Sequence, residues 1–204
     1  MKQTVRATTL GFTFSALIIL SGVALSQQID VAVGGNITMA PAGSTADSHH
    51  SPQSLNNGQY ASVNADILLH KRIGLEVEGA WRWRRGTYVP GGYNQPYRPI
   101  FLDANALWMP QVSKRMYAEL MGGVGVDNTR FYAGSQTCGF VSCTSFVSSN
   151  HFMGHLGGGF KYYVFRNFFI RPEAHVYIVH NNVEFSSDHL VRYGVSIGYT
   201  FRKQ

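Results

Sequence analysis

The stretch Ile73-Gly74-Leu75-Glu76-Val77-Glu78-Gly79-Ala80-Trp81-Arg82-Trp83-Arg84 alternates between two kinds of side chain. Its odd-numbered positions are apolar or glycine, whereas most of its even-numbered positions carry a charge. Because successive side chains of a β-strand point to opposite faces, this period of two predicts a strand with one apolar and one charged face. Alternation alone does not show which face points to the interior, since a soluble sandwich buries the apolar face and a membrane barrel turns it outward to lipid.

The same alternation recurs along the chain and predicts eight strands. They are expected over residues 29–39, 60–69, 73–84, 98–109, 115–126, 151–164, 169–180 and 189–201. Most run for about 12 or 13 residues, which is long for a strand of a soluble protein, where ~5–6 is usual. A tilted strand that crosses a bilayer needs ~9–11 residues and gains a few more beyond the hydrocarbon.

The connections between these strands alternate in length. The long ones cover 41–57, 85–97, 127–150 and 181–188, and the tight ones cover 70–72, 110–114 and 165–168. This rhythm is typical of outer-membrane barrels, and it predicts an all-β, eight-stranded antiparallel up-and-down transmembrane β-barrel. We expect the termini and short turns in the periplasm and the long loops outside the cell. Leu69 and Ile73 share a face only if the turn between them has three residues, which predicts a bulge there.

The N-terminal segment has the features of a secretory signal. Lys2 and Arg6 precede an apolar stretch over 10–25. In Ala24-Leu25-Ser26, the first and last residues are small, and they occupy the two positions that a signal peptidase inspects. We therefore expect a signal peptide over 1–26, cleaved before Gln27, with an uncleaved membrane anchor as the alternative. The remaining residues, 27–204, would form one barrel domain in the outer membrane of a Gram-negative-type bacterium. They contain no run of ~20 apolar residues that could cross a bilayer as a helix.

Two cysteines, Cys138 and Cys143, lie close together within the predicted loop 127–150. In an exported protein, an even number of neighbouring cysteines predicts a disulfide. A zinc site that uses both thiolates and His151 is the alternative, although no second pair of ligands has suitable spacing.

The charged face of the strands predicts an ionic network inside the barrel, because eight strands leave a lumen that side chains fill. The residues assigned to this network are Asp66, Glu76, Glu78, Arg82, Arg84, Asp103, Glu119, Lys161, Arg171, Glu173 and Arg192. Five basic groups against six acidic ones predict a nearly balanced plug of ion pairs, since buried charge persists when it is paired. Acid–base catalysis by these carboxylates is a weaker alternative. We expect no bound metal or cofactor.

The last strand carries a family resemblance. Residues 191–201 end on the aromatic pair Tyr199 and Phe201 and resemble the closing strand of outer-membrane barrels. The hairpin over 157–174 is similar to the matching hairpin of the small OmpA-like and OmpX-like barrel family. The resemblance implies that Tyr199 and Phe201 form the signal read by the barrel-assembly machinery. It also implies that periplasmic chaperones bind the chain during biogenesis and that the folded barrel contacts outer-membrane lipid, including lipopolysaccharide. The barrel is expected to be a monomer.

For function, these features favour a non-enzymatic barrel that displays its loops for envelope integrity, adhesion or surface recognition. An outer-leaflet lipid-modifying enzyme is one alternative, suggested by His49 and His50 beside Asp47 and Ser51. A narrow channel and a soluble lipocalin-like carrier are two others. The chain carries 17 Lys and Arg against 11 Asp and Glu. This mild, scattered excess does not predict binding to nucleic acid.

Overall fold

The computed structural model describes residues 28–41, 54–70, 72–88, 94–138, 143–180 and 188–201, with the backbone alone at 133–138 and 143–144. The main strands are β1 (Gln28–Met39), β2 (Gly58–His70), β3 (Ile73–Arg82), β5 (Gln95–Trp108), β7 (Met116–Cys138), β8 (Cys143–Tyr163), β9 (Phe168–Val179) and β10 (His189–Thr200). Two short strands, β4 (Gly86–Tyr88) and β6 (Gln111–Ser113), pair with β5 and β7. The predicted signal peptide and the His49–His50 cluster lie outside the described residues.

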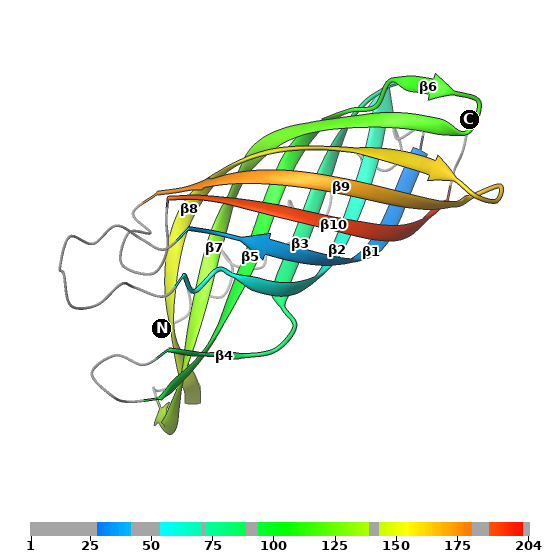
Figure 1. Ribbon diagram of the computed structural model, residues 1–204. Helices are drawn as coiled ribbons and strands as arrows, with labels where there is room; N and C mark the ends of the chain where they lie inside the picture. Colours follow the sequence, from blue (N-terminus) through cyan, green and yellow to red (C-terminus); the bar gives the residue numbers. More distant parts are fainter. Residues whose placement is uncertain are drawn as a thin grey trace, which may run out of the picture.

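The eight main strands close into a barrel (Figure 1). Each is antiparallel to its neighbours, and the ring is completed by pairing of β1 with β10 and of β5 with β7. Ladder hydrogen bonds therefore surround the whole barrel, which leaves no open sheet edge along the ring. The eight-stranded antiparallel barrel, predicted from alternation, strand length and the rhythm of the connections, is confirmed. Within the described parts of the chain, no helix is long and apolar enough to cross a membrane.

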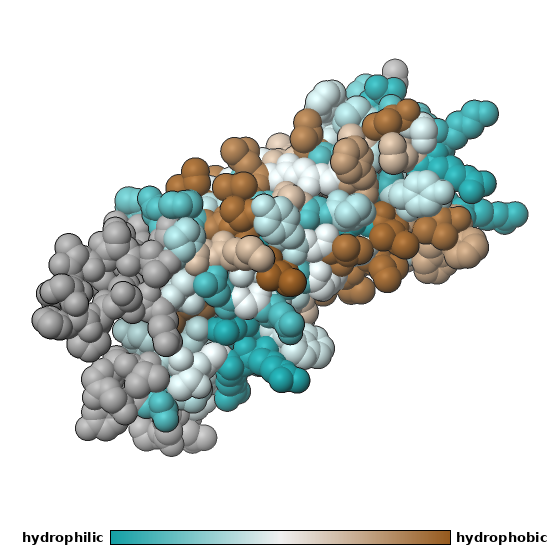
Figure 2. Space-filling model, viewed as in Figure 1, coloured by the Kyte–Doolittle hydropathy of each residue, from teal (hydrophilic) through white to brown (hydrophobic). Residues whose placement is uncertain are grey.

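The barrel has its polarity inverted relative to a soluble protein. On β3, the side chains of Glu76 and Glu78 point inward and are about 1% exposed, whereas Val77 between them is 60% exposed. Apolar side chains likewise lie on the visible outer face between more polar ends (Figure 2). Water-soluble proteins do not expose apolar surface on this scale, because its contact with water is unfavourable. The apolar exterior excludes the soluble sandwich and carrier interpretations and suits contact with lipid.

The two ends of the barrel differ. We call the end where β1 begins and β10 ends the turn end, and the opposite end the hairpin end. At the hairpin end, β7 and β8 remain paired beyond the rest of the barrel, up to the register pair Cys138 and Cys143 (Figure 1). The prediction of a loop over 127–150 was wrong for most of its length. In this extension the residue types lose the period of two, while the backbone ladder continues.

The turn between β2 and β3 contains the predicted bulge. The pairing of these strands shifts register between Leu68 and His70, and His70 then pairs with Ile73. As a result, Leu69 and Ile73 both lie on the outer face and are exposed. The bulge thus keeps the apolar face outward on both sides of the turn, as the requirement for matching faces predicted.

Candidate functional site

Arg171 of β9 is the centre of the ionic network in the lumen. Its Nη1 lies 3.2 Å from Asp66 Oδ2, 3.1 Å from Glu76 Oε2 and 3.4 Å from Glu119 Oε2. Its Nε lies 2.7 Å from Glu173 Oε2. All five side chains are buried and come from β2, β3, β7 and β9. One guanidinium therefore joins strands on opposite sides of the barrel, because its fork of N–H donors points in several directions.

Lys161 of β8 forms a second centre closer to the turn end. Its Nζ lies 2.7 Å from Asp30 Oδ2, 3.0 Å from Asp66 Oδ2 and 2.7 Å from Glu119 Oε1. Asp30 is fully buried but was not assigned to the network from the sequence. Its position between Ile29 and Val31 carries the same alternation as the other strands, so that pattern could have identified it.

Nine of the eleven residues assigned to the lumen are buried there, and the exceptions are Arg82 and Arg84. Arg82 is partly buried at the hairpin end, where its Nη1 donates to the Tyr97 hydroxyl over 2.5 Å. Arg84 is exposed, contrary to its assignment. Strand β3 ends at Arg82, and beyond a strand end the alternation no longer fixes the direction of a side chain.

The lumen is not balanced in charge as predicted. Among the described residues, eight buried carboxylates face only three buried Lys and Arg side chains. The carboxylates are Asp30, Asp66, Glu76, Glu78, Asp103, Glu119, Asp127 and Glu173, and the basic residues are Lys161, Arg171 and Arg192. The prediction failed because it included Arg82 and Arg84 and omitted Asp30 and Asp127. The arrangement is a plug of ion pairs in which acidic side chains outnumber basic ones.

Arg192 of β10 supplies the third basic group, at the hairpin side of the network. Its Nη2 lies 2.5 Å from Glu78 Oε2, and its guanidinium carbon lies 5.2 Å from the centre of the Tyr177 ring. Next to it, two buried histidines form a chain of hydrogen bonds. His155 Nδ1 lies 2.7 Å from Asn105 Oδ1, and His155 Nε2 lies 2.9 Å from His175 Nδ1.

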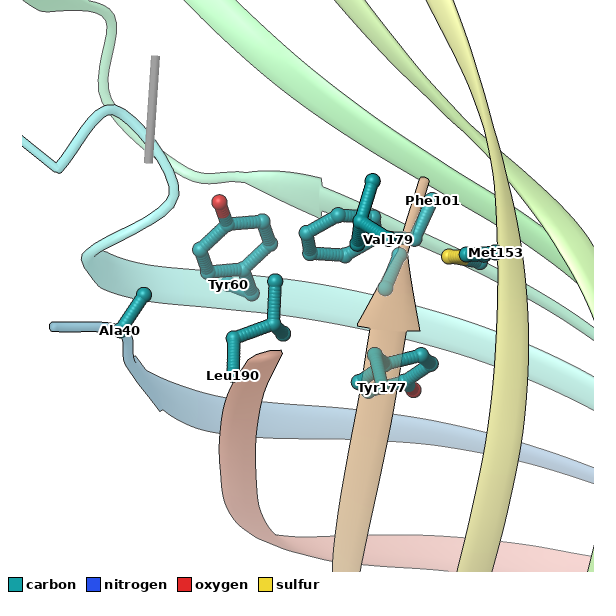
Figure 3. Packing of buried hydrophobic residues seen from close by; sticks show 8 residues of the cluster. Ala40, Tyr60, Phe101, Met153, Tyr177, Val179 and Leu190 are labelled. Atoms are coloured by element: carbon teal, nitrogen blue, oxygen red, sulfur yellow. The ribbon is translucent and has the colours of Figure 1, made fainter. Parts of the chain in front are cut away.

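A cluster of buried apolar side chains, three of them aromatic, packs inside the barrel on the hairpin side (Figure 3). Tyr60 stacks on Phe101 with ring centres 5.4 Å apart, and Phe101 stacks on Tyr177 at 5.5 Å. Met153 and Leu190 complete this buried cluster. The lumen therefore changes from an ionic core to an apolar one along the barrel, and both parts are packed with side chains.

The two cysteines face each other in the backbone register at the tip of the β7–β8 hairpin. Their side chains lie outside the described residues, so the disulfide and the alternative zinc site stay predictions. Nearby, sequence reasoning missed a serine–histidine contact, in which Ser149 Oγ lies 2.8 Å from His151 Nε2. His151 Nδ1 lies 3.3 Å from the carbonyl oxygen of His180. A spacing of two residues along one strand gives little sequence signal for such a pair.

The predicted assembly signal lies at the turn end. The rings of Tyr199 and Phe201 meet edge to face with centres 5.1 Å apart, and Tyr199 meets Phe168 at 4.9 Å. Phe201 is exposed on the outer face, and its amide donates to the Ile29 carbonyl oxygen. These aromatic rings form part of a girdle at one edge of the apolar exterior, the position that such rings prefer at a membrane interface.

No protein-family model matches this chain, and no curated protein is similar to it in sequence. Solved structures are similar in fold. Neisserial surface protein A has a TM-score of 0.59 at 11% identity, covering 84% of this chain and 96% of its own. A major outer membrane protein from Thermus thermophilus has a TM-score of 0.53 at 11% identity, covering 85% and 99%. The N-terminal β-barrel domain of Pseudomonas aeruginosa OprF has a TM-score of 0.51 at 11% identity, covering 86% and 98%. The chain thus has the fold of the small eight-stranded transmembrane β-barrels of outer membranes.

Proposed function

We propose that this protein is a non-enzymatic integral outer-membrane barrel that displays its hairpin end outside the cell, for envelope integrity, adhesion or surface recognition. Export would use the predicted signal peptide over 1–26. The observation that carries the proposal is a combination of two features. A lumen filled with ion pairs makes the barrel a rigid support, and the β7–β8 hairpin extends well beyond the apolar exterior. Such an extension offers backbone and side chains for contact with a partner.

Outer-membrane fractionation with heat-modifiable gel migration tests the barrel in its membrane. We expect the protein in the outer-membrane fraction, with a folded form that migrates differently before and after boiling. An epitope inserted after Gly139, in the connection between β7 and β8, should be labelled on intact cells. Recovery of the protein as a freely soluble periplasmic species would contradict the proposal, and an epitope labelled only after lysis would contradict its orientation.

The disulfide predicted between Cys138 and Cys143 provides a separate prediction. The Cys138→Ser variant should keep its folded gel migration, because the eight-strand ring does not depend on the tip of the hairpin. The hairpin should become more sensitive to added protease, since a cross-link restrains the ends of the segment it closes. Reduced wild-type protein is the matched control and should behave like the variant. A large fall in the yield of folded barrel would show that the hairpin is needed for folding.

Lipid contact at the outer leaflet is a further part of the proposal. Arg98 and Arg130 lie directly opposite each other on β5 and β7, on the outer side at the hairpin end of the apolar exterior. Arg130 Nε donates to Asn128 Oδ1 over 3.0 Å. Like charges placed opposite each other in a sheet repel, so the phosphates of lipopolysaccharide would relieve an existing repulsion. During biogenesis, the exposed Phe201 would be available to the barrel-assembly machinery.

One observation favours a second candidate function, a lipid-modifying enzyme. Ser149 and His151 have the contact expected of a serine and its general base, and a backbone carbonyl holds His151 where a triad would use a carboxylate. Mass spectrometry of outer-membrane lipid from cells with wild-type protein or the Ser149→Ala variant tests this alternative. Acyl chains that differ between the two strains would support enzymatic activity, and identical lipid profiles would remove it.

A further inference from the structure

Three buried carboxylates converge on the hairpin side of the ionic network. Glu76, Glu78 and Asp103 each place one oxygen within 4.8 Å of the oxygens of the other two. Glu78 on β3 lies opposite Asp103 on β5 in the strand register, and Glu76 is the next inward-facing residue on β3. Each of the three side chains is at most 5% exposed. The fold thus holds three oxygen ligands together away from bulk water.

Arginine side chains pair with only two of these three carboxylates, Glu76 and Glu78. Arg171 also contacts Asp66, Glu119 and Glu173 besides Glu76, and Arg192 contacts Glu78. Asp103 has no ion pair with any Lys or Arg of the described residues. Its contacts are an amide hydrogen bond of 2.6 Å from Asn105 and a separation of 3.5 Å from His155 Nδ1. Burial of an ionised carboxylate without a partner is strongly unfavourable, so either bound protons or a further positive charge must neutralise these carboxylates.

Buried polar atoms around the carboxylates also lack partners among the described residues. They include Glu78 Oε1 and Asp103 Oδ2, and both polar atoms of the Asn64 side chain. Asn64 is 2% exposed and lies opposite Glu78 on the inward face of β2. The buried Tyr177 hydroxyl likewise has no hydrogen-bond partner among the described residues, and the centre of its ring lies 5.2 Å from the guanidinium carbon of Arg192, the partner of Glu78. Because buried polar groups are normally satisfied, Asn64 and Tyr177 indicate an occupant independently of the carboxylates.

The charge distinguishes the possible occupants. Water would satisfy the free donors and acceptors but would leave the negative charge unchanged. A divalent cation satisfies the oxygens and offsets the charge together. Carboxylate and amide oxygens are the ligands of hard cations such as Ca²⁺, Mn²⁺ and Mg²⁺. Three oxygens within 4.8 Å of one another lie at most about 2.8 Å from a common centre, so small side-chain movements bring them to the Ca²⁺–oxygen distances of about 2.3–2.6 Å.

We propose that Glu76, Glu78 and Asp103 bind a hard divalent cation inside the barrel, with the Asn64 amide oxygen as a neutral ligand. The cation joins β2, β3 and β5 from within, and Arg192 offsets the remaining charge through Glu78. The stacked rings of Tyr60, Phe101 and Tyr177 lie on the hairpin side of the site. The ion is therefore taken up while the barrel closes and exchanges slowly afterwards. Such a site departs from the expectation of a metal-free lumen.

The test uses full-length protein purified from membranes in detergent, unfolded in urea with EDTA, and refolded with or without Ca²⁺ or Mn²⁺. After gel filtration into metal-free buffer, elemental analysis should find about one retained ion per wild-type chain. Electron paramagnetic resonance should show the Mn²⁺ signal of a bound ion. The Asp103→Asn variant should retain at least about tenfold less, since loss of even an outer-shell partner costs that much. Refolding with Ca²⁺ should increase the urea resistance of the wild type alone.

Asp127→Asn is the matched control, because Asp127 is another fully buried carboxylate held by neutral groups, Asn56 and Thr129. This variant should retain the ion as the wild type does. In EDTA, Asp103→Asn should fold at least as well as the wild type, since it removes an uncompensated charge without changing shape. Wild-type protein that retains no ion, or equal retention by Asp103→Asn, would overturn the proposal and assign the neutralisation to protons. If Asp103→Asn does not fold, Mn²⁺ retention by the wild type alone still decides whether an ion is bound.

Discussion

Replacing Arg171 with methionine should reduce the free energy of unfolding of the barrel by about 3–5 kcal/mol, the usual cost of removing one partner from buried ion pairs. The guanidinium contacts four carboxylates, and all of them stay in the lumen after the substitution. Asp66 and Glu119 keep their ion pairs with Lys161, but Glu173 and Glu76 lose their ion pairs with Arg171. The penalty is therefore that of buried, uncompensated charge and not of lost packing, since methionine fills much of the space.

Equilibrium unfolding in urea, followed by gel migration without boiling, measures this loss. Arg84→Met is the matched control, because it makes the same chemical change at an exposed position. It should stay within about 0.5 kcal/mol of the wild type, as most surface substitutions do. An equal loss in both variants would indicate a general effect of net charge, and an unchanged Arg171→Met would mean that the carboxylates of the lumen are neutralised without the guanidinium.

The barrel could be predicted because alternation recurs in every strand, and because it is combined with long strands and with connections that alternate in length. Outward positions along the exterior are apolar and inward positions of the ionic core are polar or charged, so the contrast places Val77 and Glu78 on opposite faces. The bulge at His70 could also be predicted, since it follows from keeping both neighbouring strands in phase. These properties are local, so they can be predicted from one strand or from two consecutive strands.

The lumen could be predicted only in part, because alternation gives the face of a residue but not its height along the barrel. Arg171 meets Asp66 and Glu76 although they are 105 and 95 residues away in sequence. Their contact depends on the stagger between strands, which adds up around the ring. The same limit applies to Glu78, Asp103 and Asn64, which share a level only through the registers of β2, β3 and β5. The spacing of residues within one strand therefore does not predict which residues of different strands lie at the same height.

The hairpin of β7 and β8 shows where the pattern fails for a different reason. Beyond the apolar exterior, both faces of a strand meet water, so selection for apolar side chains ceases. Residues 127–150 then look like a loop rich in polar residues, although the backbone ladder runs through register pairs such as Phe131 with Val147. The loss of alternation thus marks the edge of the exterior belt, not the end of the strand.

That edge can be tested directly with two valines that have similar exposure. Val77 on the outer face of β3 is 60% exposed, and Val147 in the hairpin extension is 69% exposed. Val77→Arg should reduce the free energy of unfolding in phospholipid vesicles by about 2–4 kcal/mol, the cost of an arginine facing lipid at mid-depth. Val147→Arg should change it by less than about 0.5 kcal/mol, as expected for a surface substitution in water.

Urea unfolding of both variants in the same vesicles gives the comparison. The substitution is the same in both variants, and the two valines have similar exposed fractions. A difference in stability between the variants therefore shows whether lipid or water surrounds each valine. An arginine at position 77 must leave water for hydrocarbon, whereas one at position 147 stays hydrated. Equal effects at the two positions would mean that lipid does not surround the barrel at the level of Val77. In that case, the apolar exterior would need another covering, and the outer-membrane proposal would fail with it.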